Sequence, residues 1–177
     1  ASILDLIYTG LGQTPSPEVK DGTTVLVKDI DYVLSYADNT NVGRSTVTIT
    51  GKRNYTGNRV VTFNISPSLL TITADNKSKE FGEVDPTLTV TYRGFVNGED
   101  KEDLTGTLAI RRVTGETVGT YDIEASGLTA TNYAITYTAG VFTITSKLIT
   151  DTDIAVAPIA DLVYNGFSQR PKPIVED

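Results

Sequence analysis

Cysteine, histidine, methionine and tryptophan are all absent from this sequence of 177 residues. Without cysteine there is no disulfide framework, zinc thiolate site or cysteine nucleophile, and without histidine there is no His-based catalytic triad. Basic residues are also few, 15 against 22 acidic residues, and no basic run is longer than Arg111-Arg112. The formal net charge of −7 makes nucleic acid a poor partner. These absences argue against most enzyme chemistry and against nucleic-acid binding.

Long hydrophobic runs are missing as well. The longest apolar stretches surround Val60-Val61 and Leu69-Leu70, far below the roughly 18 residues that span a bilayer. We therefore expect no membrane insertion. Residues 1–7 lack an initiator methionine, a basic start and a long apolar run, so we expect an excised piece rather than a signal peptide. The lack of cysteine fits both the cytosol and extracellular bacterial proteins, so composition leaves the compartment open.

Threonine is abundant, with 28 residues, and it is accompanied by 15 glycines and 9 tyrosines. This mixture favours short β-strands separated by tight turns. Apolar and polar residues alternate with the period of 2 that half-buried strands show, as in residues 46–50, 61–65 and 121–125. Turn dipeptides such as Asp21-Gly22 and Asn97-Gly98 separate the runs. The pattern predicts antiparallel sheets packed face to face.

An internal repeat organises the chain. Residues 1–21 realign with residues 157–177 at an offset of 156, with 11 identities in 21 positions. A fainter match at about half that offset relates Asn54-Tyr55 to Asn132-Tyr133. A fixed period of this kind indicates a modular architecture, and proline at position 67 ends strand pairing between two modules.

The repeat predicts three segments. Residues 1–67 form a first β repeat domain, residues 68–147 form a second, and residues 148–177 form a linker with the truncated start of a third repeat. We expect an all-β chain of tandem immunoglobulin-like β-sandwich domains. Because each repeat supplies only five or six strands where a full immunoglobulin sandwich has seven, β-grasp-like sheets with one short helix at residues 99–104 are the alternative.

The second unit carries a family resemblance. Its signatures are Phe81-Gly82, Asp85-Pro86, Tyr92-Arg93-Gly94-Phe95, Val118-Gly119-Thr120-Tyr121 and Asn132-Tyr133. With these residues it resembles the MBG-type repeat domains of bacterial surface adhesins. The first unit is similar to the companion repeat often strung beside them, on the basis of Tyr8-Thr9-Gly10, Gln13-Thr14-Pro15 and Asn54-Tyr55-Thr56-Gly57. The resemblance implies secretion, display on a bacterial cell surface and a tandem array, but neither a catalytic activity nor one ligand.

Acidic clusters are the first candidate sites. Glu99-Asp100 and Glu102-Asp103 place four carboxylates within five residues, but glycoside hydrolysis needs two carboxylates held apart across a cleft. We interpret them as a solvated loop. Calcium ligands of the right type occur in segments 29–31, 38–41 and 151–153. None has the spacing of an EF-hand, and Asp and Asn favour turns on their own account, so we expect no metal site.

Tyrosine pairs are the second candidate. Tyr32 and Tyr36 are four residues apart, as are Tyr133 and Tyr137, so each pair lies on one side of a strand. Such rings can stack on sugars, but the same spacing describes packing in a core or across a sheet, and we favour packing.

A covalent crosslink between lysine and asparagine would suit an extracellular stalk. Asn64 lies in a terminal strand of the first unit, with Lys20 or Lys28 upstream. Such a bond would also need a buried acid, which the sequence alone does not locate, so the crosslink stays an open alternative.

The leading hypothesis is a non-catalytic repeat or stalk segment of a bacterial cell-surface adhesin, which spaces or presents a binding region outside the cell. Two alternatives are a glycan- or host-protein-binding module and an accessory domain of an extracellular enzyme. The expected partners are neighbouring repeats of the same chain, with host glycan or protein as further candidates. We expect a monomer with no catalytic residue, no cofactor and no metal, and the residues that bind a ligand are unknown.

Overall fold

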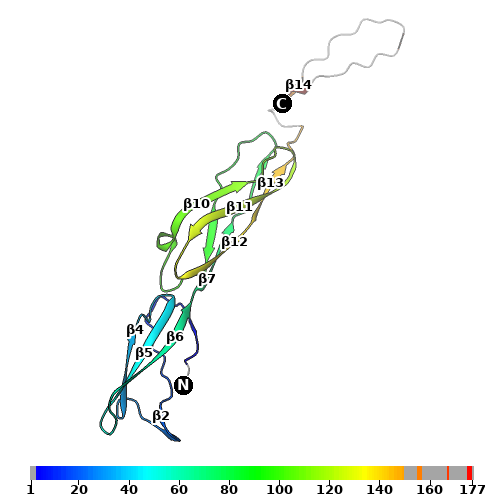
Figure 1. The fold of residues 1–177 in the computed structure, drawn as a ribbon. Helices are drawn as coiled ribbons and strands as arrows, with labels where there is room; N and C mark the ends of the chain where they lie inside the picture. Colours follow the sequence, from blue (N-terminus) through cyan, green and yellow to red (C-terminus); the bar gives the residue numbers. More distant parts are fainter. Residues whose placement is uncertain (1–2, 150–154, 157–166, 168–174, 177) are drawn as a thin grey trace.

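The structure, a computed structural model, describes residues 3–149, 155–156, 167 and 175–176. Within these residues the chain is built almost wholly of β-strands, arranged as two units that follow one another along a common long axis (Figure 1). This confirms the predicted all-β, sandwich-like class. The first unit ends with strand β6 at Ser66, and the second begins with strand β7 at Ser68.

The first unit is a four-stranded sheet with a cover of loops. The sheet has the order β1-β6-β5-β4, and a separate hairpin joins β2 to β3. The strands are β1 (Leu6–Ile7), β2 (Lys20–Asp21), β3 (Thr24–Val25), β4 (Tyr32–Ala37), β5 (Gly43–Gly51) and β6 (Asn58–Ser66). As the alternation predicts, Val47, Phe63 and Ile65 face inward and are buried. The Tyr36 hydroxyl donates to the Pro15 carbonyl at 3.0 Å and ties the cover to the sheet.

The second unit is a sandwich of two sheets. One sheet has the order β10-β11-β13-β8, and the other has the order β12-β7-β9. The strands are β7 (Ser68–Ala74), β8 (Lys77–Glu80), β9 (Val90–Arg93), β10 (Thr105–Arg112), β11 (Gly119–Thr129), β12 (Tyr133–Thr138) and β13 (Gly140–Thr145). Ala74, Ile123, Phe142 and Ile144 form a buried cluster between the sheets. These positions alternate with exposed or half-buried ones along their strands, which is why the period of 2 located them.

Three strand pairs run parallel, so the expectation of purely antiparallel sheets is wrong. They are β1 with β6, β12 with β7, and β13 with β8. In the longest of these pairs Tyr133 lies opposite Ser68 and Thr138 lies opposite Thr73. Parallel strands need a long crossover between them, and here the crossover consists of the other strands of the same unit. Alternation indicates which side chains share a face, but it does not encode the direction of the neighbouring strand.

The short helix expected within residues 99–104 is a single 3-10 turn, η1 (Lys101–Asp103), which buries no residue. It therefore cannot cover a sheet as a β-grasp helix does. No helix in the part of the chain that the structure describes is long and apolar enough to cross a membrane. Beyond the second unit, β14 (Ala155–Val156) pairs antiparallel with β15 (Val175–Glu176). Of the predicted segment 148–177, residues 150–154, 157–166, 168–174 and 177 lie outside the described residues.

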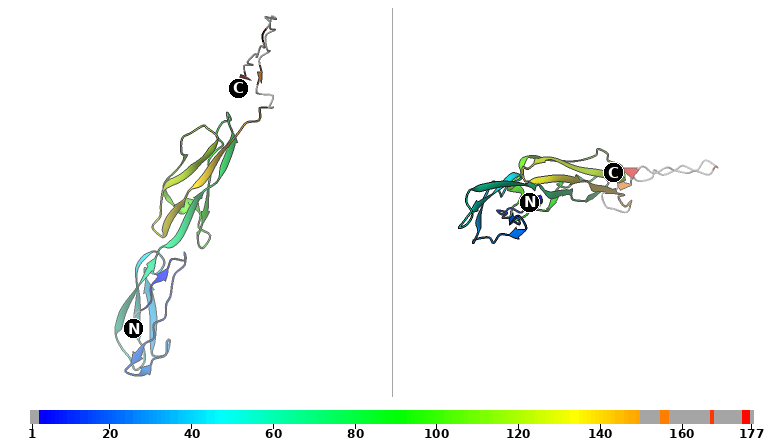
Figure 2. Two further views of the ribbon diagram at one scale, coloured as in Figure 1. Left: turned by 90° about the vertical axis from the view of Figure 1, so that its right-hand side faces the viewer. Right: turned by 60° about the horizontal axis from the view of Figure 1, so that its bottom comes forward.

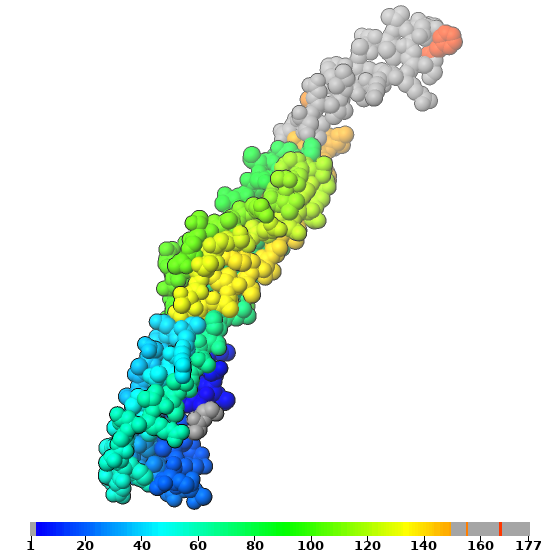
Figure 3. All heavy atoms as spheres, viewed as in Figure 1, coloured from blue at the N-terminus to red at the C-terminus, as the bar shows by residue number. Residues whose placement is uncertain are grey.

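A hydrophobic cluster continues from the first unit into the second. Its buried members are Tyr8, Val47, Phe63, Ile65, Leu70 and Tyr133. Half-buried side chains from both units, including Val42 and Phe95, pack against it. The two units therefore share part of a core, and only Pro67 separates the last strand of the first unit from the first strand of the second. Together the units make an elongated body (Figures 2 and 3).

Leu70 and its neighbour Leu69 test this arrangement, because Leu70 is fully buried in the shared cluster whereas Leu69 is 61% exposed. We expect Leu70→Ala to lower the free energy of unfolding by about 2–5 kcal/mol, through lost burial and the cavity left behind. Leu69→Ala should change it by about 0.5 kcal/mol or less. Urea denaturation followed by circular dichroism measures both. Equal losses for the two variants would contradict the register of β7.

Candidate functional site

A network of hydrogen bonds lies where the two units meet. The Tyr8 hydroxyl of the first unit donates a hydrogen bond of 2.5 Å to Glu99 Oε1 of the second. The Tyr133 hydroxyl donates to the other oxygen of the same carboxylate, Glu99 Oε2. The Tyr133 oxygen also accepts the Val96 N–H at 3.1 Å. One carboxylate thus serves a phenol from each unit, and we call the contacts of Tyr8, Gly10, Asn97, Glu99 and Tyr133 the clasp.

Aromatic packing holds the same groups. The rings of Tyr8 and Tyr133 meet edge to face, with centroids 5.7 Å apart and planes at 83°. Phe95 meets Tyr133 in the same manner at 5.6 Å. Such pairs contribute about 0.5–1.5 kcal/mol beyond the area that they bury. Because both tyrosines are buried on their apolar sides, their hydroxyls must find partners at the junction, and Glu99 provides them.

The clasp also includes Gly10. The Asn97 side-chain amide donates to the Gly10 carbonyl at 3.1 Å. A Cβ atom at Gly10 would lie 2.6 Å from the Asn97 Cβ, and the backbone of Gly10 has φ +73°, where glycine is favoured. The second unit therefore approaches this backbone so closely that no side chain fits.

Two asparagines add further hydrogen bonds at the junction. The Val42 N–H donates to Asn132 Oδ1 at 3.1 Å, and Asn132 Nδ2 donates to Asn41 Oδ1 at 3.2 Å. Asn41 therefore serves the contact between units. The calcium role weighed for segment 38–41 gains no support, because Asn39 donates to the Gln13 carbonyl at 2.8 Å.

The clasp shifts the ionisation of both tyrosines. The hydrogen bond to Glu99, reinforced by burial, raises the pKa of Tyr8 above its ordinary value. Burial, reinforced by the hydrogen bond to Glu99, raises the pKa of Tyr133 to about 12. A raised pKa means that the folded state prefers the neutral phenol, so this contribution to stability is complete below about pH 10. It is lost as the pH rises from about 10 to 12.

The interpretation of residues 99–103 as a solvated loop is wrong for Glu99, which is half-buried and engaged by two tyrosines. It holds for the exposed Glu102. Asp100 and Asp103 have a local role, since each side chain accepts a backbone N–H of the 3-10 turn in a capping box. These carboxylates are not arranged as a catalytic pair.

A second charged cluster closes the opposite end of the second unit. Lys79 Nζ lies 2.8 Å from Asp85 Oδ1, and Arg112 forms ion pairs with Asp85 and Glu116. The Arg112 side chain is only 9% exposed, and its guanidinium lies 4.7 Å from the centroid of the Phe142 ring. It also donates to the carbonyls of Val113 and Gly115. This end cluster, Lys79, Asp85, Arg112 and Glu116, covers the core with a network in which each charge is paired.

The end cluster shifts the ionisation of its acids. The hydrogen bond from Arg112, followed by that from Lys79, lowers the pKa of Asp85 from 3.8 to about 2. Hydrogen bonds from Lys79 and Arg112 lower the pKa of Glu116 as well. Both acids are therefore ionised under ordinary conditions, and their role is that of a structural network.

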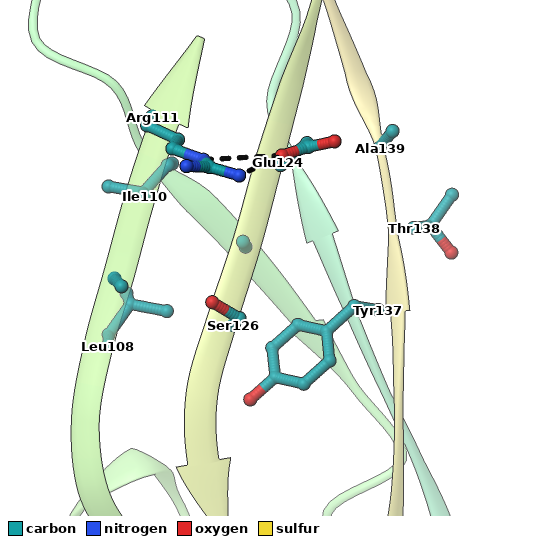
Figure 4. A pocket seen from close by; sticks show the side chains of 10 residues that line it. Leu108, Ile110, Arg111, Glu124, Ser126, Tyr137, Thr138 and Ala139 are labelled. Atoms are coloured by element: carbon teal, nitrogen blue, oxygen red, sulfur yellow. Dashed lines mark hydrogen bonds and ion pairs between the residues drawn. The ribbon is translucent and has the colours of Figure 1, made fainter. Parts of the chain in front are cut away.

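An open groove of about 830 Å³ lies along the second unit, between strands β10 and β11 on one side and β12 on the other (Figure 4). Leu108 and Ile110 give it an apolar wall. Arg111 pairs with Glu124 at 3.0 Å on its rim, and the Tyr137 hydroxyl donates to the Leu128 carbonyl at 3.0 Å. The charged pair and the Tyr137 hydroxyl are thus engaged within the protein and are not free to orient a small substrate.

The other candidates from the sequence have structural roles. Tyr32 and Tyr133 are buried, and the hydroxyls of Tyr36 and Tyr137 donate to backbone carbonyls, so neither pair offers two exposed rings for stacking. Asn64 is exposed and donates to Asp5 at 3.1 Å, which is not the buried setting of a lysine crosslink.

No group of three or more acidic side chains suited to a metal ion occurs among the described residues. Asp31 accepts the Val27 N–H at 2.9 Å within a local turn, which accounts for one acid of segment 29–31. Segment 151–153 lies outside the described residues.

Comparison with known families identifies the second unit. Residues 70–143 match the family described as MBG domain (YGX type). The matched residues extend from β7 into β13 and include the Glu99 side of the clasp and the whole end cluster. The first unit lies outside the match, so its assignment as a companion repeat stays a prediction. None of the curated proteins compared with the chain matches it.

Replacing Glu99 by glutamine tests the clasp. Loss of the negative charge should let Tyr8 ionise at a lower pH than in the wild type, because the charged acceptor is the main cause of its raised pKa. Alkaline titration of tyrosinate absorbance measures this, and Tyr8→Phe assigns the signal. Glu102→Gln, at an exposed position, is the matched control and should leave the titration unchanged. An identical curve for Glu99→Gln would show that the clasp does not form.

The end cluster predicts a specific acid sensitivity. Because the pKa of Asp85 is lower in the folded state, its ionised carboxylate stabilises the fold at any pH above its ordinary pKa. That stabilisation is lost as the pH falls toward the pKa of the folded state, here between about pH 5 and 2. We expect Asp85→Asn to be less stable than the wild type at pH 7, with a smaller further loss on acidification. Asp122→Asn, which is exposed and outside the cluster, should follow the wild type. Thermal unfolding at several pH values measures the difference, and parallel curves for wild type and Asp85→Asn would contradict the network.

Proposed function

Because an MBG-type domain is clasped here to the unit that precedes it, we propose that the chain is a non-catalytic stalk segment of a bacterial cell-surface adhesin. Its task is to hold a binding region at a defined distance from the cell. The observation that carries this proposal is the hydrophobic cluster shared by both units, with the Glu99 carboxylate bonded to a tyrosine from each.

A spacer must resist bending at its joints. If the units were joined by Pro67 alone, they would swing about a flexible hinge. The clasp instead adds hydrogen bonds, ring contacts and buried apolar surface across the joint. The arrangement therefore supports a stiff pair of units with a fixed reach.

A non-catalytic role is supported by the state of the polar groups. Glu99, Asp100 and Asp103 serve the clasp and a capping box, and the acids of the end cluster are paired with Lys79 and Arg112. Extracellular location on a bacterial surface belongs to the same proposal, and the MBG-type second unit supports it. Antibodies raised against the chain should label intact cells of the bacterium that produces it.

Two other functions are distinguishable from a stalk. A glycan-binding module has less support, because one tyrosine of each candidate pair, Tyr32 or Tyr133, is buried. Binding of host protein would have to use other surfaces, such as the groove beside Tyr137, and would be reduced by Ile110→Asp in a pull-down with the host ligand. An accessory domain of an extracellular enzyme predicts a catalytic domain elsewhere in the same polypeptide, which the sequence of the full-length parent decides.

The stalk proposal predicts one fixed length. The sequence has no cysteine, so Thr23→Cys in the β2–β3 turn and Glu83→Cys beyond β8 create two unique sites for spin labels at opposite ends of the pair (Figure 1). We expect double electron–electron resonance to give a single narrow distance distribution for the full chain. Two labels within the second unit, at Glu83 and Thr129, provide the reference width for a rigid body. A distribution much broader than this reference would contradict a stiff spacer.

A further inference from the structure

The clasp is selective for a short motif in the first unit. The second unit contacts Tyr8 through the Glu99 carboxylate, and it contacts Gly10 through Asn97 at a distance that admits no side chain. The residue between them, Thr9, is exposed. The second unit therefore recognises the pattern Tyr-X-Gly, in which the middle residue is free to vary.

The same pattern occurs again in the sequence at Tyr164-Asn165-Gly166, within the segment that repeats residues 1–21. The differences between the two copies follow the burial of the first copy. Within residues 3–21 every position that differs is exposed: 4, 7, 9, 11, 12, 14, 16, 18 and 20. The buried or half-buried positions are all identical: 3, 6, 8, 10, 13, 15, 17 and 19. The second copy has kept the residues that face the protein and changed those that face water.

Two exposed positions, Asp5 and Asp21, are also identical, and both make contacts. Asp21 Oδ2 accepts the Tyr55 hydroxyl at 3.5 Å. Asp5 Oδ1 accepts the Asn64 N–H at 3.2 Å, just before β1 pairs with β6. Gln13 is retained because its side-chain amide donates to the Ile7 carbonyl at 2.8 Å and closes the turn that presents Tyr8 and Gly10. The sequence of the second copy thus retains the motif together with the residues that correspond to Asp5 and Gln13.

We propose that Tyr-X-Gly is a docking motif for the clasp end of an MBG-type domain, and that Tyr164-Asn165-Gly166 is a second copy of that motif. Its partner would be a further MBG-type domain that carries the equivalents of Asn97, Glu99 and Tyr133. This deepens the stalk proposal and rests on it only for the presence of such a partner in a tandem array. The clasp would then recur at each place where a unit of the first type precedes an MBG-type domain.

The first experiment transfers the second motif into the joint that the structure describes. In one variant, Ile7→Val and Thr9→Asn convert residues 6–10 into the sequence of residues 162–166. In a larger variant, residues 1–21 carry the whole sequence of residues 157–177. Spin labels at Ser35→Cys on β4 and Thr120→Cys on β11, both exposed, report the joint. We expect both variants to retain the narrow distance distribution of the parent, with an unfolding midpoint shifted by a few degrees at most.

The second experiment tests whether Gly10 is recognised by the second unit or required only by its own backbone. Gly10→Ala should broaden the distance distribution several-fold. Adding Asn97→Gly removes the Cβ that an alanine at position 10 would strike, while leaving the φ of residue 10 as it is. Partial recovery of the narrow distribution in the double variant would support docking, and no recovery would assign the effect to backbone strain in the first unit alone.

The outcomes separate this proposal from the stalk proposal. A folded transfer variant with a broad distribution, while the parent is narrow, would overturn the docking motif and leave the stalk intact. A narrow distribution for Gly10→Ala would also overturn it. If the distance distribution of the parent chain is itself broad, the stalk proposal is contradicted. Should the 21-residue transfer fail to fold, the two-residue variant alone decides, because it changes only exposed positions.

Discussion

The bond of one carboxylate to two phenols is the interaction on which the long shape of this protein depends. Glu99 is the common acceptor, and Tyr8 and Tyr133 are donors from different units. Hydrogen bonds to charged groups contribute about 1.5–3 kcal/mol each, and a buried phenol left without a partner costs a similar amount. The edge-to-face rings and the shared apolar cluster can assemble only if both hydroxyls are satisfied at the same place. Polar bonding and burial at the joint are therefore coupled.

The two ends of the MBG-type unit differ in the chemistry of their polar contacts. At the clasp end, one half-buried acid is surrounded by neutral donors, so the contact selects its partner by shape and hydrogen-bond geometry. At the other end, two cations and two anions are linked in a network over Phe142. Such a network closes a sandwich without needing another protein surface. The two ends of the unit are therefore not equivalent: the clasp end contacts the first unit, and the other end is covered by the end cluster.

The sequence was sufficient for the strands and for the faces that they bury, because alternation in β5, β6 and β11 follows directly from the pleat. It was insufficient for the parallel pairing of β7 with β12, since the same side chains share a face whichever way the neighbouring strand runs. Glu99 was misjudged for a related reason. An acid beside other acids in a turn looks solvated, and its donors lie 91 and 34 residues away. The Tyr-X-Gly motif was visible as a repeat, but only the structure shows that the second unit contacts it.

The one-residue connection between β6 and β7 determines how a pulling force on the chain reaches the second unit. Chain enters the second unit through β7 at the joint and leaves through β13 at the opposite end, so a pull on both ends acts along the strands. The hydrogen bonds between β13 and β8, and between β7 and β12, lie across that direction. Under such a pull the hydrogen bonds of each pair are loaded at the same time, and they cannot break one after another. A pulling force on both ends of the chain would meet the combined resistance of whole ladders.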